Sequence, residues 1–299
     1  MNDKTLQDAI VIASYGIQCR IETADKSLLR AKSLKSAGKT LCGDKVKYKT
    51  EQNNEIVITE ILPRTTILSR LNNLNPKPKQ IASNIDQMII VISVTSSIKF
   101  GLIDRYLIAA AFSGFNPVIV INKIDTIEPQ ALDAVKQAMQ IYADIELPLF
   151  YMSAINNIGI DSFLSVTANK TNIVVGQSGV GKSSIVNAIL PSMPAITKEI
   201  SESNNKGKHT TTTAYLYDIP NNGKLIDSPG IREFGLWNIE KNDLAKGFTE
   251  IQHTGEQCKF RDCSHHNEPG CAVVAAVKAG NISQKRYDSY LSIFESLDT

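Results

Sequence analysis

The residues from Gly176 to Ser183 constrain the fold more than any other part of this 299-residue chain. They read GQSGVGKS and lie between an apolar run, TNIVV, and an amphipathic run, SSIVNAIL. The spacing G-x-x-x-x-G-K-[ST], placed between a strand and a helix, lets successive backbone N–H groups turn inward around phosphate oxygens at the helix N-terminus. This order of strand, loop and helix predicts a parallel α/β sheet that binds a nucleoside phosphate.

The loop residues and the start of the helix are predicted to hold the phosphates. Lys182 is expected to neutralise the β- and γ-phosphates, and the Ser183 hydroxyl is expected to bind Mg²⁺. The other nucleotide-binding residues predicted in this segment are Gly176, Gln177, Ser178, Gly179, Val180, Gly181 and Ser184. The loop by itself does not separate ATP from GTP.

The motif NKID, at the end of the apolar run PVIVI, indicates guanine. Its aspartate, Asp125, can accept hydrogen bonds from the guanine amino and imino groups. Adenine does not offer that pattern, so adenine would leave the carboxylate unsatisfied. Asn122 is expected to brace the pocket and Lys123 to lie along the base. An ATPase is the competing enzyme class, and it would require ATP to compete with GTP.

A second guanine contact is predicted after the run LPLFYM, at Ser153 and Ala154. A small residue at the end of this strand brings a backbone N–H to the guanine carbonyl oxygen in GTPases.

The segment DSPG, which follows the run KLI, has the spacing D-x-x-G of a magnesium and γ-phosphate sensor. Asp227 is expected to hold Mg²⁺ through water, and the Gly230 N–H is expected to contact the γ-phosphate. The polar segment 207–213, GKHTTTT, precedes it. One threonine there should complete the Mg²⁺ shell, either Thr211 or Thr212, and the sequence does not choose between them.

The motifs occur in a circularly permuted order. NKID at 122 and the Ser-Ala pair at 153 precede the phosphate loop, although they close the series in an ordinary small GTPase. Because the termini of a domain often lie close together at the surface, joining them and opening the chain elsewhere can preserve the site.

The residue directly after DSPG is Ile231, where Ras-like enzymes have the glutamine that orients the attacking water. Isoleucine cannot hydrogen-bond water, so another group is needed. His209, in the threonine segment, is the candidate to position water or accept its proton. A lone loop histidine is also often merely exposed. If no group replaces the glutamine, the chain is a GTP-binding, RNA-binding switch that does not hydrolyse GTP.

A second cluster of functional residues lies within CKFRDCSHHNEPGC. Three thiolates and one imidazole form the ligand set of a closed, structural zinc site. The predicted ligands are Cys258, Cys263, His265 and Cys271. His253 and His266 are alternatives for the fourth position.

Residues 9 to 62 contain short alternating runs that predict a small antiparallel sheet or barrel. Between Lys26 and Lys49, eight lysines and arginines face one acid, Asp44. Such a region is either a solvated face or a nucleic-acid-binding surface of a small barrel. The net charge of +2 means that any basic surface is local. The segment 63–80 has prolines at both ends, four basic residues and no acid, and it is interpreted as a linker that could also contact phosphate.

The N-terminus lacks a basic start followed by an apolar stretch, and no segment is long and apolar enough to span a bilayer. We therefore expect a cytoplasmic protein that does not interact with membranes.

Taken together, the motifs resemble those of the ribosome small-subunit-dependent GTPase family, also called RsgA or YjeQ. The resemblance rests on NKxD, SA, GxSGVGKS, GKHTTT, DSPG and C-x4-C-x-H-x5-C in this order, behind a β-rich N-terminal region. It implies an α/β fold: a circularly permuted P-loop GTPase core, an OB-like N-terminal barrel and a small helical zinc domain. The implied boundaries are 1–64, 65–234 and 235–299.

The same resemblance implies the activity and the partners. Hydrolysis of GTP to GDP would need Mg²⁺, with His209, Lys182 and Asp227 as catalytic residues. The four zinc ligands match the family one for one, which implies one Zn²⁺ per chain. The partners would be the small ribosomal subunit and its rRNA. The subunit would stimulate hydrolysis in its late maturation, hydrolysis would release the factor, and the chain would be a monomer.

Overall fold

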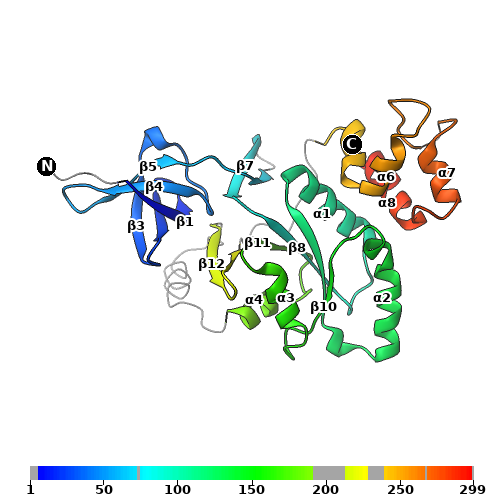
Figure 1. The fold of residues 1–299 in the computed structure, drawn as a ribbon, viewed down its shortest axis with the longest axis horizontal. Helices are drawn as coiled ribbons and strands as arrows, with labels where there is room; N and C mark the ends of the chain where they lie inside the picture. Colours follow the sequence, from blue (N-terminus) through cyan, green and yellow to red (C-terminus); the bar gives the residue numbers. More distant parts are fainter. Residues whose placement is uncertain (1–5, 73–74, 191–212, 228–238, 267, 298–299) are drawn as a thin grey trace. The chain divides into compact units, whose positions relative to one another are not determined.

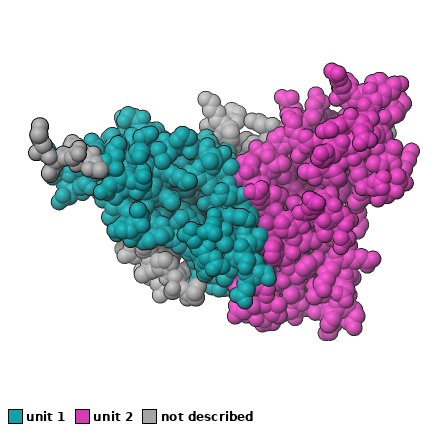
Figure 2. All heavy atoms as spheres, in the orientation of Figure 1, with its two compact units in different colours: residues 1–87, 161–174, 183–233 teal, residues 88–160, 175–182, 234–299 magenta. Residues whose placement is uncertain are grey.

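The structure is a computed structural model that describes residues 6–72, 75–190, 213–227, 239–266 and 268–297 (Figure 1). The chain forms two compact units, coloured separately in Figure 2. Unit 1 contains residues 1–87, 161–174 and 183–233, and unit 2 contains residues 88–160, 175–182 and 234–299. One cut of this division, between residues 233 and 234, lies within one residue of the predicted boundary at 234, whereas no cut lies near residue 64. The three-domain division stays a prediction.

Five strands of unit 1 form the predicted barrel. They are β1 (Gln7–Tyr15), β2 (Gln18–Thr23), β3 (Leu28–Ser33), β4 (Lys45–Thr50) and β5 (Ile56–Ile61), with a short 3-10 turn, η1 (Lys35–Ala37), after β3. The strand order is β1-β2-β3-β5-β4, and β4 pairs back with β1, which closes the barrel. Only the β3–β5 pairing is parallel.

Alternation along the strands fills the barrel. In β4, KVKYKT, Val46 and Tyr48 are buried while the lysines between them point outward, as the two-residue period of a strand requires. The buried core is Ala9, Val11, Cys19, Ile21, Ala31, Val46, Tyr48 and Ile58.

The segment interpreted as a linker forms most of a two-stranded antiparallel ribbon instead, β6 (Ile67–Asn72) with β7 (Asn75–Ser83). The linker interpretation relied on the prolines of this segment, including Pro76 and Pro78 in β7. Proline cannot donate a ladder hydrogen bond, but each strand of a two-stranded sheet has one edge outside the ladder, where proline is tolerated.

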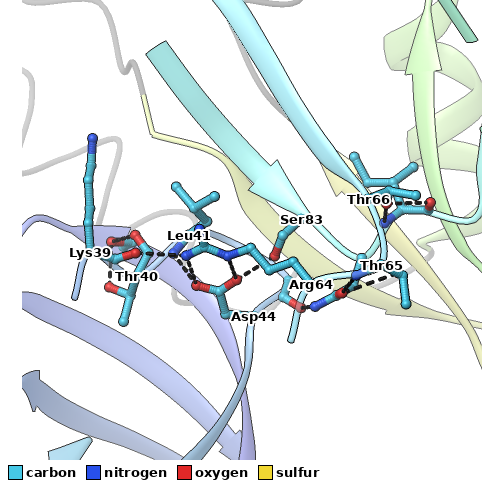
Figure 3. A network of polar contacts seen from close by, with 12 residues as sticks. Lys39, Thr40, Leu41, Asp44, Arg64, Thr65, Thr66 and Ser83 are labelled. Atoms are coloured by element: carbon cyan, nitrogen blue, oxygen red, sulfur yellow. Dashed lines mark hydrogen bonds and ion pairs between the residues drawn. The ribbon is translucent and has the colours of Figure 1, made fainter. Parts of the chain in front are cut away.

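A buried carboxylate joins the barrel to this ribbon (Figure 3). Asp44 is 0% exposed. Its oxygens accept hydrogen bonds from Arg64 Nε at 2.7 Å and Nη2 at 2.8 Å, and from Ser83 Oγ and Leu41 N, both at 2.6 Å. Because a buried charge is tolerated only when it is paired and hydrogen-bonded, these contacts fix the barrel loop against the start and end of the ribbon.

Unit 1 also contains β11 (Thr171–Val175), β12 (Tyr215–Ile219) and β13 (Gly223–Asp227), in the order β11-β13-β12-β1. The β11–β13 pairing is parallel, and β12 runs antiparallel to both β13 and β1. The turn between β12 and β13 has Asn221 at φ 60° and Asn222 at φ 55°, so both central residues are left-handed, as in a type I′ hairpin. The helices are α3 (Ile160–Thr167) and α4 (Lys182–Ile189).

Unit 2 has the strand order β10-β9-β8. The elements are β8 (Gln87–Ser93), α1 (Phe100–Ser113), β9 (Asn116–Asn122), η2 (Ile124–Thr126), α2 (Pro129–Ala143) and β10 (Leu149–Tyr151). β8 is buried along almost its whole length, as expected for a strand covered on both faces. The C-terminal part of unit 2 is helical, with η3 (Lys241–Gly247), α6 (Thr249–Gly255), α7 (Ala272–Lys278) and α8 (Gln284–Ser296).

Within the described ranges, every helix is too short or too polar to traverse a lipid bilayer.

Candidate functional site

The glycines of the phosphate loop have backbone conformations that other residues rarely adopt. Gly176, Gly179 and Gly181 have φ of 142°, 83° and 96°. A Cβ on Gly176 would overlap the carbonyl oxygen of Val91, and a Cβ on Gly181 would overlap the side-chain amide of Asn122. Two of the three glycines are therefore also required by the close approach of neighbouring strands.

The remaining loop residues lie where the motif predicts them. α4 begins at Lys182, whose ammonium group donates to the carbonyl oxygens of Gly176 at 2.7 Å and Gln177 at 2.6 Å. The two loop serines, Ser178 and Ser183, are both exposed. The lysine therefore folds over the loop, and both serines remain accessible to solvent.

Asn122 connects three motifs that lie far apart in the sequence. It ends β9 and is 1% exposed. Its Nδ2 donates to the carbonyl oxygen of Val180 at 3.0 Å, and its Oδ1 accepts from the backbone N–H of Ala154 at 3.2 Å. The structure thus brings together the guanine motif, the phosphate loop and the Ser-Ala pair, all within unit 2.

The residues after Asn122 turn sharply away from β9. Lys123 has φ 66° and ψ 32°, a left-handed conformation that is uncommon outside glycine. Asp125 lies in η2 and is exposed, and its carboxylate forms no hydrogen bond or ion pair with any residue that the structure describes. Ser153 is buried, and its hydroxyl accepts from the backbone of Asn156 at 3.2 Å. Asp125 is therefore the open acceptor of this motif.

Asp227 ends β13, which runs parallel to β11, the strand that leads into the phosphate loop. The carboxyl ends of adjacent parallel strands meet at one edge of a sheet, where ligands bind in open α/β folds. Asp227 is exposed at that edge. Five residues singled out by the sequence lie outside the described residues: His209, Thr211, Thr212, Gly230 and Ile231.

The predicted zinc ligands come together in unit 2. Their ligand atoms all lie within 4.8 Å of one another, and the four residues are Cys258, Cys263, His265 and Cys271. The sulfurs of Cys258 and Cys271 are 3.9 Å apart, and His265 Nδ1 lies 3.5 Å and 3.7 Å from them. Tetrahedral zinc with Zn–S near 2.3 Å places two sulfurs about 3.8 Å apart. The cluster therefore fits one zinc ion.

Of the three candidate histidines, His265 is the one that lies within the cluster. His253 and His266 are exposed, whereas His265 is buried, and its ring occupies space that a side chain on Gly255 would fill. Burial lowers the pKa of the His265 imidazole, which keeps the ring neutral, the form that binds a metal.

Sequence reasoning missed the residues that hold this cluster in place. The Tyr287 hydroxyl donates to the carbonyl oxygen of His265 at 2.8 Å, and the Tyr290 hydroxyl donates to that of Ser264 at 3.0 Å. Glu268 accepts from the backbone of Ser264 at 2.9 Å. The two tyrosines are three residues apart and therefore share a face of α8, a spacing that could have indicated their role.

A buried charge network attaches these helices to α1. Arg286 of α8 is 2% exposed, and it donates to Asp104 of α1 at 2.5 Å and to Glu250 of α6 at 2.7 and 3.1 Å. Tyr142 of α2 donates to the same Asp104 oxygen at 2.9 Å. Although burial opposes the charge of the guanidinium, the carboxylate of Asp104 raises the pKa of Arg286.

Comparison with known proteins places this site in a family. Residues 61–237 match the family described as RsgA GTPase. A protein named "Small ribosomal subunit biogenesis GTPase RsgA" from Haemophilus influenzae (strain 86-028NP) is 40% identical over 295 residues, covering 97% of this chain and 85% of that protein. Its namesake from Shewanella oneidensis is 40% identical over 298 residues, covering 98% and 84%.

Two solved structures have the same fold over nearly the whole chain. YjeQ from Thermotoga maritima is 29% identical with a TM-score of 0.82, covering 98% of this chain and 99% of that one. YloQ, described as a circularly permuted GTPase, is 26% identical with a TM-score of 0.79, covering 99% and 96%. The predicted fold class is confirmed: a circularly permuted GTPase core with a five-stranded N-terminal barrel and a C-terminal Cys3His cluster. The chain belongs to the RsgA GTPase family.

Proposed function

We propose that this chain hydrolyses GTP in the late maturation of the small ribosomal subunit, that the subunit stimulates hydrolysis, and that hydrolysis releases the chain. The observation that carries the proposal is the position of Asn122, which bonds both the phosphate loop and the Ser-Ala pair. A single pocket can therefore hold a guanine base and its phosphates. The names of the relatives supply the ribosomal role.

The guanine-binding role belongs to the open carboxylate of Asp125 and to the Ala154 backbone. Asp125 accepts from the imino and amino groups of guanine, and the Ala154 N–H lies beside the carbonyl oxygen of the base. Lys123 covers the base from the turn after β9. Discrimination against adenine arises because a mismatched base leaves polar groups of the pocket unpaired.

The phosphates occupy the loop from Gly176 to Ser183, and Lys182 exchanges its loop carbonyls for phosphate oxygens. Ser183 and Asp227 would hold Mg²⁺, together with Thr211 or Thr212. When bound, the ion offsets the charge of the β- and γ-phosphates.

The hydrolytic step needs an activated water, since Ile231 cannot hydrogen-bond one. We assign this role to His209, which orients the water and accepts its proton as the oxygen attacks the γ-phosphorus. The bond between the γ-phosphorus and the bridging oxygen breaks, giving GDP and phosphate. The Gly230 N–H contacts the γ-phosphate and loses that contact afterwards.

The barrel supplies an rRNA-binding surface. Of the eight cations counted from Lys26 to Lys49, Arg30, Lys35, Lys39 and Lys45 form no ion pair within the described part of the chain. Unpaired cations on a small barrel suit the phosphate backbone. We further propose that the protein is a cytoplasmic monomer that does not interact with membranes.

The test is multiple-turnover GTPase activity of the zinc-loaded chain with purified small or large ribosomal subunits. We expect small subunits to raise the rate strongly. Stimulation by large subunits alone would overturn the partner assignment. Single-turnover phosphate release by His209→Ala separates an enzyme from a switch: equal, near-zero rates in wild type and variant would favour the switch.

A further inference from the structure

A cavity of about 200 Å³ lies beside the Cys3His cluster, within unit 2. Its walls come from the start of η3, from the knuckle loop (residues 258–265) and from α8. One water needs about 10–15 Å³ of such space, so the cavity accommodates a much larger group. It is smaller than the roughly 300 Å³ at which pockets for drug-sized ligands begin, which favours one ring system.

One wall of the cavity is aromatic. Tyr290 and Phe294, one helical turn apart on α8, have ring centroids 6.1 Å apart and an interplanar angle of 29°. Tyr290 is 2% exposed, and its hydroxyl is bonded to Ser264. This ring is therefore fixed. The Lys241 ammonium group lies 4.4 Å from the centroid of Phe294 and covers its face.

The rim of the cavity is polar and mostly cationic. Lys241 and Arg261 line it, together with the amide of Asn242 and one acid, Asp262. Arg261 is exposed and forms no ion pair with the residues described here. Arg261 lies in the knuckle loop between the predicted zinc ligands Cys258 and Cys263.

Beside Arg261, Phe260 is 41% exposed, and Lys259 lies over its ring at 5.5 Å. The run Lys259-Phe260-Arg261 thus places an exposed ring between two cations on a loop that the metal would make rigid. Alternating rings and cations are the pattern by which proteins hold single-stranded nucleic acid, because every base has a stacking face and every nucleotide a phosphate.

We propose that this cavity binds one unpaired base of rRNA, which displaces Lys241 from the face of Phe294. Lys241 and Arg261 then contact the flanking phosphates. Phe294 is partly exposed. The exchange is favourable because a lysine over a solvent-accessible ring is worth about two- to fivefold in an equilibrium constant, whereas base stacking is worth about five- to 150-fold. The amide of Asn242 and the carboxylate of Asp262 face the edge of the base. This inference rests on the proposed function, since it names the RNA element that the zinc-bearing part recognises.

The first test measures binding of a fluorescein-labelled nine-nucleotide single-stranded RNA of random sequence to the full, zinc-loaded chain. Lys241→Gln combined with Arg261→Gln should weaken binding about tenfold. It should also lower the slope of log Kd against log salt by about 1.4, from two lost phosphate contacts. Phe294→Leu should weaken binding about tenfold with little change in the salt slope. Lys278→Gln, an exposed cation on α7, and Phe112→Leu, a ring 40% exposed on α1, are the matched controls.

Zinc content of one ion per chain and an unchanged melting curve verify that each variant is folded. If Phe294→Leu fails this check, the test depends on the variant that combines Lys241→Gln with Arg261→Gln, because neither of these side chains is buried. Both variants binding the RNA as tightly as wild type would overturn the proposal.

The second test uses the subunit itself. In the double variant, the small-subunit concentration that gives half-maximal GTPase stimulation should rise about tenfold, while activity without subunits stays the same. If wild type and variant respond equally, the cavity inference fails and the proposed function stands. If subunits do not stimulate wild type, the proposed function fails, and the oligonucleotide result decides the cavity. With subunits whose rRNA carries 4-thiouridine, cross-links of rRNA to the knuckle loop or α8 support the proposal, and cross-links of rRNA only to other parts of the chain overturn it.

Discussion

Replacing Asn122 by alanine tests whether the guanine motif and the phosphate loop form one pocket. The side chain is 1% exposed and makes two hydrogen bonds, to the Val180 carbonyl at 3.0 Å and from the Ala154 N–H at 3.2 Å. Alanine leaves both backbone groups, the Val180 carbonyl and the Ala154 N–H, without the Asn122 side chain as a partner. Since Val180 is 5% and Ala154 is 7% exposed, neither backbone group gains ready access to water.

The magnitude follows from these two orphaned groups. A buried polar group without a partner costs about 1–3 kcal/mol, so the two together cost about 2–6 kcal/mol before any relaxation. Part of this cost is a loss of stability in the free protein. The rest weakens nucleotide binding, because the loop and the Ser-Ala pair must both return to their positions around the ligand. If about 1.4 kcal/mol falls on binding, GDP affinity drops about tenfold.

The assay is titration with a fluorescent GDP analogue, together with thermal unfolding of the same samples. The matched control is Asn156→Ala, an exposed residue near Ala154 whose backbone N–H, the group bonded to Ser153, survives the substitution. Asn122→Asp should be at least as damaging as alanine, because a second carboxylate oxygen would face the Val180 carbonyl. A folded Asn122→Ala protein that binds GDP within twofold of wild type would refute the reasoning.

Three further predictions concern stability. Arg64→Ala should destabilise the protein by about 3–5 kcal/mol in urea unfolding, because it leaves the Asp44 carboxylate buried beside neutral partners. Removing zinc with a chelator should lower the temperature at which the helical signal of α6, α7 and α8 is lost on heating. Added zinc should restore the original melting temperature. Although burial opposes the shift, hydrogen bonds from Lys224 and Lys26 lower the pKa of Asp218 to about 2, so its contribution to stability, complete above the unfolded value of about 3.9, should disappear as the pH falls through 2.

Each of these has a control. Arg30→Ala, an exposed cation on the barrel, should change stability by less than about 0.5 kcal/mol. For the zinc experiment, a melting curve that the chelator leaves unchanged would contradict a structural metal. For Asp218, the carboxyl carbon followed by NMR titration should show the shifted midpoint, and Lys224→Met should return it toward about 3.9. A wild-type midpoint near that unfolded value would contradict the lowered pKa.

The conformation of the phosphate loop and the clustering of three cysteines with His265 could be predicted from the sequence, because each depends on local chemistry. Gly176 and Gly181 need φ values that only glycine adopts readily, and the thiolates of the knuckle loop lie close together in the chain. The barrel was also predictable, because β4 alternates buried and exposed residues with a period of two. In these places the local pattern and the tertiary environment agree.

Contacts between distant segments that carry no motif were not predictable. Nothing near Asp44 in the sequence indicates that Arg64 and Ser83 satisfy it, and nothing near Arg286 indicates Asp104. The ribbon of β6 and β7 was missed because its prolines mask the strand pattern, and only a two-stranded sheet with open edges accommodates them. These contacts and the ribbon depend on which surfaces of the folded chain pack against each other, and the local sequence pattern does not specify this packing.

The pairing of Ala13 in β1 with Tyr215 in β12 has a consequence for dissecting the protein. Without residues 1–64, β12 would lose this ladder partner at Tyr215 and would become the edge strand of its sheet, paired only with β13. An exposed edge strand is a template on which other chains can pair, and natural proteins usually cover such edges. The barrel therefore protects the chain against aggregation, in addition to its proposed role in rRNA binding. A truncated chain that keeps only the catalytic core should self-associate at concentrations where the full chain stays dispersed.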